Sequence, residues 1–105
     1  MNRIKISEQF SDTPGGRYKR DGAYSGEEFR EKYLKPKFDS LKEDETLLLD
    51  LDGAYGYPTS FLEEAFGGLA RIYGIEKVLD KLKFKSDEEP SLIEEIKGYI
   101  KNAKS

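Results

Sequence analysis

The stretch from Leu47 to Gly74 constrains the fold most, because it joins an apolar run, a tight loop and an amphipathic helical pattern. The run is made by Leu47–Leu49 and Leu51, and its length is typical of a strand covered on both faces, as in a parallel sheet with helices on either side. Because strand side chains alternate, Asp50 and Asp52 point the same way at its end. The stretch therefore predicts a polar site where a strand ends and a helix begins.

The loop after this strand predicts where the next helix begins. Pro58 biases Tyr57 towards extended geometry, so the helix should start beyond it. Ser60 and Glu63 have the spacing of a capping box, in which the serine accepts a backbone amide hydrogen and the glutamate reaches back. Apolar residues then recur at helical spacing up to Tyr73. The pair Gly67-Gly68 costs about 1 kcal/mol per residue relative to alanine, and we expect close packing of this helix on the sheet to offset that cost.

Other local patterns place the remaining elements. The predicted elements are a strand at Arg3–Ile6, a short second strand around Tyr18, a helix opened by a capping box at Ser25 and stopped or kinked by Pro36, and a last helix opened by a capping box at Ser91. Between Ile75 and Phe84 the pattern fits either one strand from Val78 or a one-turn helix over Ile75–Leu79 followed by a short strand; we favour the second.

Alternation of strands and helices predicts an α/β fold with right-handed crossovers. We expect a small sandwich whose sheet has about four strands, mixed or mostly parallel, with helices packed on it. A length of 105 residues predicts one domain over residues 1–105.

Composition excludes several functions. The chain has no cysteine and no histidine, which rules out disulfides, zinc–thiolate sites and histidine acid–base chemistry. A net charge of −3 and a pI of about 5.1 argue against nucleic acid as a partner. The sequence shows neither a signal peptide nor an apolar stretch long enough to span a bilayer, so we expect a cytoplasmic protein without a membrane partner.

Three segments carry a family resemblance. They are Gly16-Arg17, the string SGEEFR over Ser25–Arg30 and the string TSFLEEAFG over Thr59–Gly67. Together with the apolar strand before Asp50, they make the chain resemble STAS domains, the fold of anti-sigma-factor antagonists, and more closely a set of small bacterial STAS-like proteins of unknown function. The resemblance covers most of the chain and implies a STAS-like sandwich.

The resemblance also implies a role. In the antagonists, the serine that opens the helix is phosphorylated by a kinase that is also the partner; the matching residue is Ser60, preceded by Thr59. The antagonists carry Asp and Gly around the hydroxyls, where this chain has Pro58 and Phe61. The implied function is a non-enzymatic regulatory module without a cofactor, which docks a GHKL-type ATPase or a kinase through the segment Tyr55–Glu64. The predicted partner-binding residues are Tyr57, Thr59, Ser60, Phe61 and Glu64.

Alternatives remain open for each candidate residue. Ser60 is either an N-cap, worth about 1 kcal/mol, or a phosphorylation switch. Asp50-Leu51-Asp52-Gly53 resembles the first motif of haloacid-dehalogenase phosphatases, which would make Asp50 and Asp52 magnesium ligands in a phosphate-processing enzyme. Against this, no second metal motif is present, and either carboxylate could instead bond loop amides around Gly53–Gly56.

A further alternative concerns the turn that contains Gly15, Gly16 and Arg17. Successive amides and a guanidinium suit a phosphate, so this turn could bind a nucleotide or another anion. It could equally be a plain turn that leads into the next element.

Overall fold

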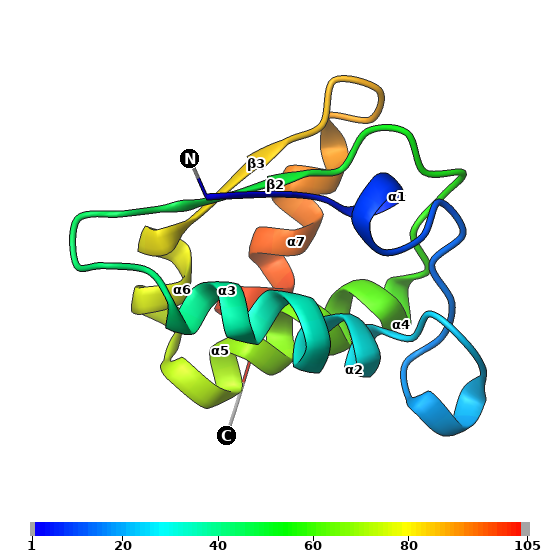
Figure 1. Cartoon of the computed structure of the whole chain (residues 1–105), viewed down its shortest axis with the longest axis horizontal. Helices are drawn as coiled ribbons and strands as arrows, with labels where there is room; N and C mark the ends of the chain where they lie inside the picture. Colours follow the sequence, from blue (N-terminus) through cyan, green and yellow to red (C-terminus); the bar gives the residue numbers. More distant parts are fainter. Residues whose placement is uncertain (1, 104–105) are drawn as a thin grey trace.

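Three short parallel strands form the sheet in the computed structural model, which describes residues 2–103 (Figure 1). The central strand β2 (Leu47–Asp50) pairs with β1 (Arg3–Lys5) on one side and with β3 (Leu82–Lys85) on the other. The α/β class and the parallel pairing are thus confirmed, with three strands in the described residues where we expected about four.

The helical elements connect the strands in the expected alternating order. They are α1 (Ile6–Gln9), the 3-10 turn η1 (Lys19–Asp21), α2 (Gly26–Phe29), the π-helical segment η2 (Arg30–Leu34), α3 (Lys35–Asp39), α4 (Thr59–Leu62), the π-helical segment η3 (Glu63–Gly67), α5 (Gly68–Tyr73), α6 (Ile75–Lys81) and α7 (Ser91–Lys101). The short helix followed by a strand after residue 75 is confirmed. The predicted strand around Tyr18 is wrong, because Tyr18 precedes the turn η1.

Helices cover one face of the sheet, as Figure 1 shows for the layer from α2 to α7 below the strands. The side chains of Ile4, Leu47 and Leu49 point into this layer and are buried. On the opposite face, Arg3 and Lys83 are exposed and Leu48 is half-buried. The expectation of a sheet covered on both faces is therefore wrong. The apolar run of the central strand suggested two buried faces, but its neighbouring strands alternate with basic residues that remain in water.

Two long helical stretches each contain a π-helical segment. The first runs from Gly26 to Asp39 through η2, and the second runs from Thr59 to Tyr73 through η3. Pro36 does not stop the first stretch. The wider π turn directly before Pro36 is one way in which a helix accommodates a residue that cannot donate the regular hydrogen bond.

One of the three predicted capping boxes has its serine at the cap. Ser25 is the N-cap of α2, and its hydroxyl accepts a hydrogen bond from the Glu28 amide at 3.0 Å. The caps predicted at Ser60 and Ser91 are wrong. Relative to a serine cap, α4 begins two residues earlier and α7 one residue earlier, with Pro58 and Pro90 at the caps. Proline suits a helix entry, since its φ is already helical and it needs no amide partner.

Candidate functional site

The loop between β2 and α4 is held in place by hydrogen bonds, some within the loop and some to neighbouring segments. The Tyr57 hydroxyl donates to the Leu51 carbonyl at 2.8 Å. The Tyr55 amide donates to the Asp12 carbonyl at 2.8 Å, and the Gly53 amide donates to the Glu88 carboxylate at 2.8 Å. Burial raises the pKa of Tyr57, with the negative charge of Asp50 as a second cause, so this phenol stays a hydrogen-bond donor. The loop is therefore a supported surface feature.

Several side chains of this segment reach solvent, among them those of Tyr55, Thr59 and Ser60. Tyr55 is 87% exposed, the largest exposure of any large hydrophobic side chain in the described residues. Thr59 is exposed and Ser60 is half-buried at the first two positions of α4. We define the docking loop as Gly53–Ser60. Tyr55 belongs to the predicted docking segment, yet we did not single it out. The sequence could have indicated its exposure, because this aromatic residue lies between two glycines and fits neither a helical nor a strand pattern of buried residues.

Two of the predicted contact residues lie inside the protein. Phe61 is fully buried, and its ring packs 5.8 Å from the ring of Phe29 on α2. Glu64 is only 8% exposed. Neither can contribute to a docking surface, so these two assignments are wrong. Tyr57 is intermediate, because its ring packs 6.1 Å from that of Phe61 while part of it remains accessible. The helix face that carries Phe61 and Glu64 is covered by the first long helix, which no local pattern revealed.

Asp50 and Asp52 are engaged by other protein groups at the end of β2. Asp50, 1% exposed, accepts hydrogen bonds from the Arg3 guanidinium at 2.6 Å and from the Asp52 amide at 3.0 Å. Asp52 accepts from the Glu88 amide at 3.0 Å, from Lys85 Nζ at 2.7 Å and from the Asp87 amide at 3.2 Å. These contacts tie β2 to β1 and to the loop after β3.

This environment also sets the ionisation of Asp52. The hydrogen bond from the Glu88 amide, followed by that from the Lys85 ammonium, lowers the pKa of Asp52 to about 2. The amide-bonding alternative is thus realised, although the amides belong to Asp52, Asp87 and Glu88 and not to Gly53–Gly56. Within residues 2–103, no three acidic side chains are grouped so that they could hold a metal ion.

The turn at Gly15–Arg17 is likewise occupied by protein groups. The Gly15 amide donates to the Tyr24 carbonyl at 2.7 Å. The Arg17 guanidinium forms ion pairs with Glu63 and, at 3.4 Å, with Glu64. Hydrogen bonding to Glu63 raises the pKa of Arg17 further above its ordinary value. The guanidinium predicted to bind an anion is therefore already paired with two carboxylates.

These contacts belong to a larger group of charged side chains between the two long helices, which we call the Arg–Glu cluster. Its members are Arg17, Arg30, Glu63, Glu64 and Arg71. Arg30 pairs with Glu64 at 2.5 Å, and Arg71 pairs with Glu63 at 2.7 Å. The hydrogen bond from Arg71 lowers the pKa of Glu63, which keeps that carboxylate charged. Glu63, which we expected to complete a capping box, instead joins two arginines.

The glycine pair of the second helix lies beside this cluster. A Cβ atom added at Gly67 would lie 2.7 Å from Glu63 Oε2, and one added at Gly68 would meet the guanidinium of Arg30. The helix does pack on the sheet, since the ring of Phe66 lies 5.7 Å from that of Phe84 on β3, but the glycines themselves face the Arg–Glu cluster. They leave room for the charged side chains, which offsets part of their low helix propensity.

The architecture defines a small α/β domain in which helices back one face of a parallel sheet and a supported loop leads into a helix. A model of the family described as STAS-like domain of unknown function (DUF4325) matches residues 25–92, about two thirds of the chain. The chain belongs to this STAS-like family, which confirms the resemblance noted from its motifs. No curated protein and no solved structure matches the chain. None of the helices in residues 2–103 has the length and apolarity needed to cross a bilayer.

Proposed function

We propose that this domain is a non-enzymatic regulatory module that binds a protein partner through the docking loop. The observation that carries the proposal is Tyr55, an aromatic side chain that is 87% exposed on a loop supported by three hydrogen bonds. Aromatic side chains on rigid supports are frequent anchors of protein interfaces, because they bury a large area while losing little conformational entropy.

The state of the acidic residues supports a binding role over the phosphatase alternative. A phosphate-processing enzyme would need Asp50 and Asp52 free to attack phosphate and to hold magnesium. In the described residues both carboxylates instead accept hydrogen bonds from Arg3, Lys85 and backbone amides. Their contacts are of the kind that fix the end of a strand.

The partner that the family resemblance implies is an ATPase or kinase of the GHKL type, and Thr59 is the better phosphate acceptor. Thr59 is exposed, whereas Ser60 is half-buried. The first turn of α4 contains no acidic residue, and a phosphate there would meet the positive end of the helix dipole. Phosphorylation would then add a charge of about −1.5 to −2 beside Tyr55 without unfolding the helix, which would change docking.

The proposal is tested by capturing partners from an extract of the native host with immobilised domain, followed by a titration with the purified partner. Tyr55→Ala should weaken binding by about tenfold or more, while Tyr18→Ala, a surface tyrosine outside the docking loop, should bind as the unchanged domain does. Equal binding by all three proteins would contradict the proposal. A partner whose binding depends on Tyr55 should also respond to Thr59→Asp if phosphorylation regulates docking.

The enzyme alternative has its own test. Magnesium titration by calorimetry, together with a phosphatase assay on the purified domain, should give neither a binding isotherm nor turnover. Turnover that disappears in Asp50→Asn while the domain remains folded would establish the alternative and overturn the non-enzymatic assignment.

A further inference from the structure

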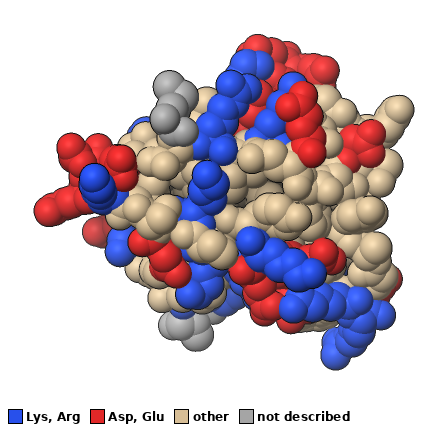
Figure 2. Space-filling view, in the orientation of Figure 1, with Lys and Arg blue, Asp and Glu red and all other residues tan. Residues whose placement is uncertain are grey.

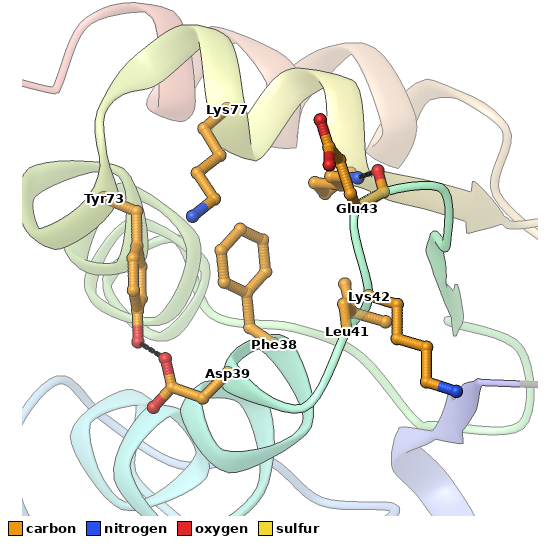
Figure 3. Close-up of a pocket in the computed structure, with 8 residues that line it drawn as sticks. Phe38, Asp39, Leu41, Lys42, Glu43, Tyr73 and Lys77 are labelled. Atoms are coloured by element: carbon orange, nitrogen blue, oxygen red, sulfur yellow. Dashed lines mark hydrogen bonds between the residues drawn. The ribbon is translucent and has the colours of Figure 1, made fainter.

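A cavity of about 280 Å³ opens where the carboxyl-terminal ends of α3 and α5 meet α6 (Figure 3). Its apolar wall is formed by Phe38, Leu41 and Tyr73. The rings of Phe38 and Tyr73 lie 4.7 Å apart, tilted by 41°. Side chains from three helical elements and the loop after α3 thus build a hollow with an aromatic wall.

None of the three lysines that line this cavity forms an ion pair with a carboxylate within residues 2–103. Lys77 extends between the two rings in Figure 3, with its ammonium 5.6 Å from the centre of the Tyr73 ring and 5.9 Å from that of Phe38. Within residues 2–103, no acidic side chain lies within 4.0 Å of the ammonium of Lys77 or Lys42. A cation over aromatic faces is held by a weaker attraction than one in a direct ion pair.

The two acidic residues that line the cavity, Asp39 and Glu43, do not neutralise its lysines. Asp39 accepts a hydrogen bond from the Tyr73 hydroxyl and pairs with Lys35 at 3.2 Å. Lys81 donates to the main-chain carbonyl of Glu43, which leaves the charge of its ammonium at the rim of the cavity. The charged residues that line the cavity are three lysines, Asp39 and Glu43, so it carries a net positive charge in a chain whose net charge is −3.

We infer that this cavity binds a small organic anion with a flat apolar body, such as an aromatic carboxylate. The ring of the ligand would lie against Leu41 and the aromatic wall, and its carboxylate would replace the ring faces as the partner of Lys77. The cavity is just below the range of about 300–1,000 Å³ that is common for drug-sized ligands, so a single-ring acid matches its size.

This cavity is independent of the docking loop. Thr59 and Tyr73 lie at opposite ends of the second helical stretch, about 21 Å apart at 1.5 Å per residue. Figure 1 likewise places the start of α4 and the end of α5 at opposite ends of the helical layer. A measurement of anion binding therefore reports on this cavity whatever the partner of the docking loop is.

The inference is tested by following the ¹H–¹⁵N spectrum of the whole chain during titration with benzoate, benzamide and acetate at constant ionic strength. Benzoate should shift the signals of Phe38, Leu41, Tyr73 and Lys77 along a saturable curve in the millimolar range. Benzamide lacks the charge and acetate lacks the ring, so each should bind at least about fivefold more weakly. Benzamide binding as tightly as benzoate, or the absence of a saturable shift, would overturn the inference.

Two lysine variants test whether benzoate binds in this cavity. Lys77→Gln should weaken benzoate binding about tenfold, the loss expected for one charge-assisted contact. Lys37→Gln is the matched control, because Lys37 is an exposed lysine of the same helix α3 as Phe38 and does not line the cavity. Equal losses in the two variants would show that benzoate responds only to overall charge, which would refute a built site.

Discussion

The guanidinium of Arg30 donates to both the carboxylate of Glu64, at 2.5 Å, and the main-chain carbonyl of the same residue, at 2.7 Å. The two side chains are 12% and 11% exposed, so the pair lies almost wholly inside the protein. Each residue belongs to a π-helical segment, and the contact joins the first long helical stretch to the second. It is the centre of the Arg–Glu cluster, on which several consequences for stability depend.

Glu64→Gln should lower the free energy of unfolding by about 2 kcal/mol, because it leaves the buried guanidinium of Arg30 with only the distant carboxylate of Glu31, 4.0 Å away, as a charge partner. Glu8→Gln is the control, since Glu8 pairs with Lys5 at the surface and should matter little. Urea denaturation of both variants measures the difference. Similar midpoints for Glu64→Gln and the unchanged protein would show that the buried pair contributes no net stability.

Gly26→Ala should destabilise the fold by about 2 kcal/mol through overpacking. A Cβ atom at this position would lie 2.5 Å from the Phe61 carbonyl oxygen and 3.1 Å from Glu64 Cβ, and backbone atoms cannot move aside as a side-chain tip can. The matched control is Gly98→Ala in α7, where a Cβ atom would meet nothing within 4 Å. That variant should gain up to about 1 kcal/mol in helix propensity. The midpoint of thermal unfolding should therefore fall in Gly26→Ala and rise in Gly98→Ala.

Asp52→Asn should flatten the acid limb of the stability profile. The pKa of Asp52 is lowered from 3.8 to about 2 in the folded protein. As the pH falls below 4, the unfolded chain therefore takes up this proton before the folded protein does, and stability is lost until the pH reaches about 2. Thermal midpoints measured from pH 5 to pH 2 should fall less steeply in Asp52→Asn than in Asp44→Asn, a change at an exposed loop position. Parallel profiles would argue against a strong role for the Lys85 and Glu88 contacts.

Thr59→Asp should raise the free energy of unfolding by about 0.5 kcal/mol at low salt, because a negative charge in the first turn of α4 interacts favourably with the helix dipole. Thr59→Lys should lower stability by a similar amount, and added salt should shrink both effects. If the aspartate variant were strongly destabilised instead, a phosphate at this position would disrupt the helix, and regulation by phosphorylation of an intact surface would be ruled out.

The face of the molecule seen in the space-filling view is highly charged. Figure 2 shows acidic and basic side chains intermingled over the visible face, with uncharged areas between them. Both proposals therefore rest on single groups, the exposed ring of Tyr55 and the ammonium of Lys77, and not on a large apolar or single-sign patch.

Much of the fold could be predicted from local patterns. Alternating strands and helices, the strand at Leu47–Leu49 and the N-cap at Ser25 all follow from spacing along the chain, because the residues that make each of these features are close in sequence. The residues at which helices begin were predicted less well. At Ser60 and Ser91 the capping pattern is present, but Pro58 and Pro90 take the cap positions. A serine cap and a proline cap are both common helix starts, and the local sequence does not show which one the folded chain uses.

Local patterns also predicted the loop between β2 and α4, but they misassigned which of its neighbouring residues face outward. Phe61 and Glu64 are buried because the first long helix covers that side of α4, and Arg30 is 34 positions away from Glu64 in the chain. The same holds for Gly67 and Gly68, whose role depends on charged side chains brought in from elsewhere. The order and type of the elements thus follow from short-range periodicity, whereas burial, charge pairing and the aromatic cavity arise only when distant segments pack together.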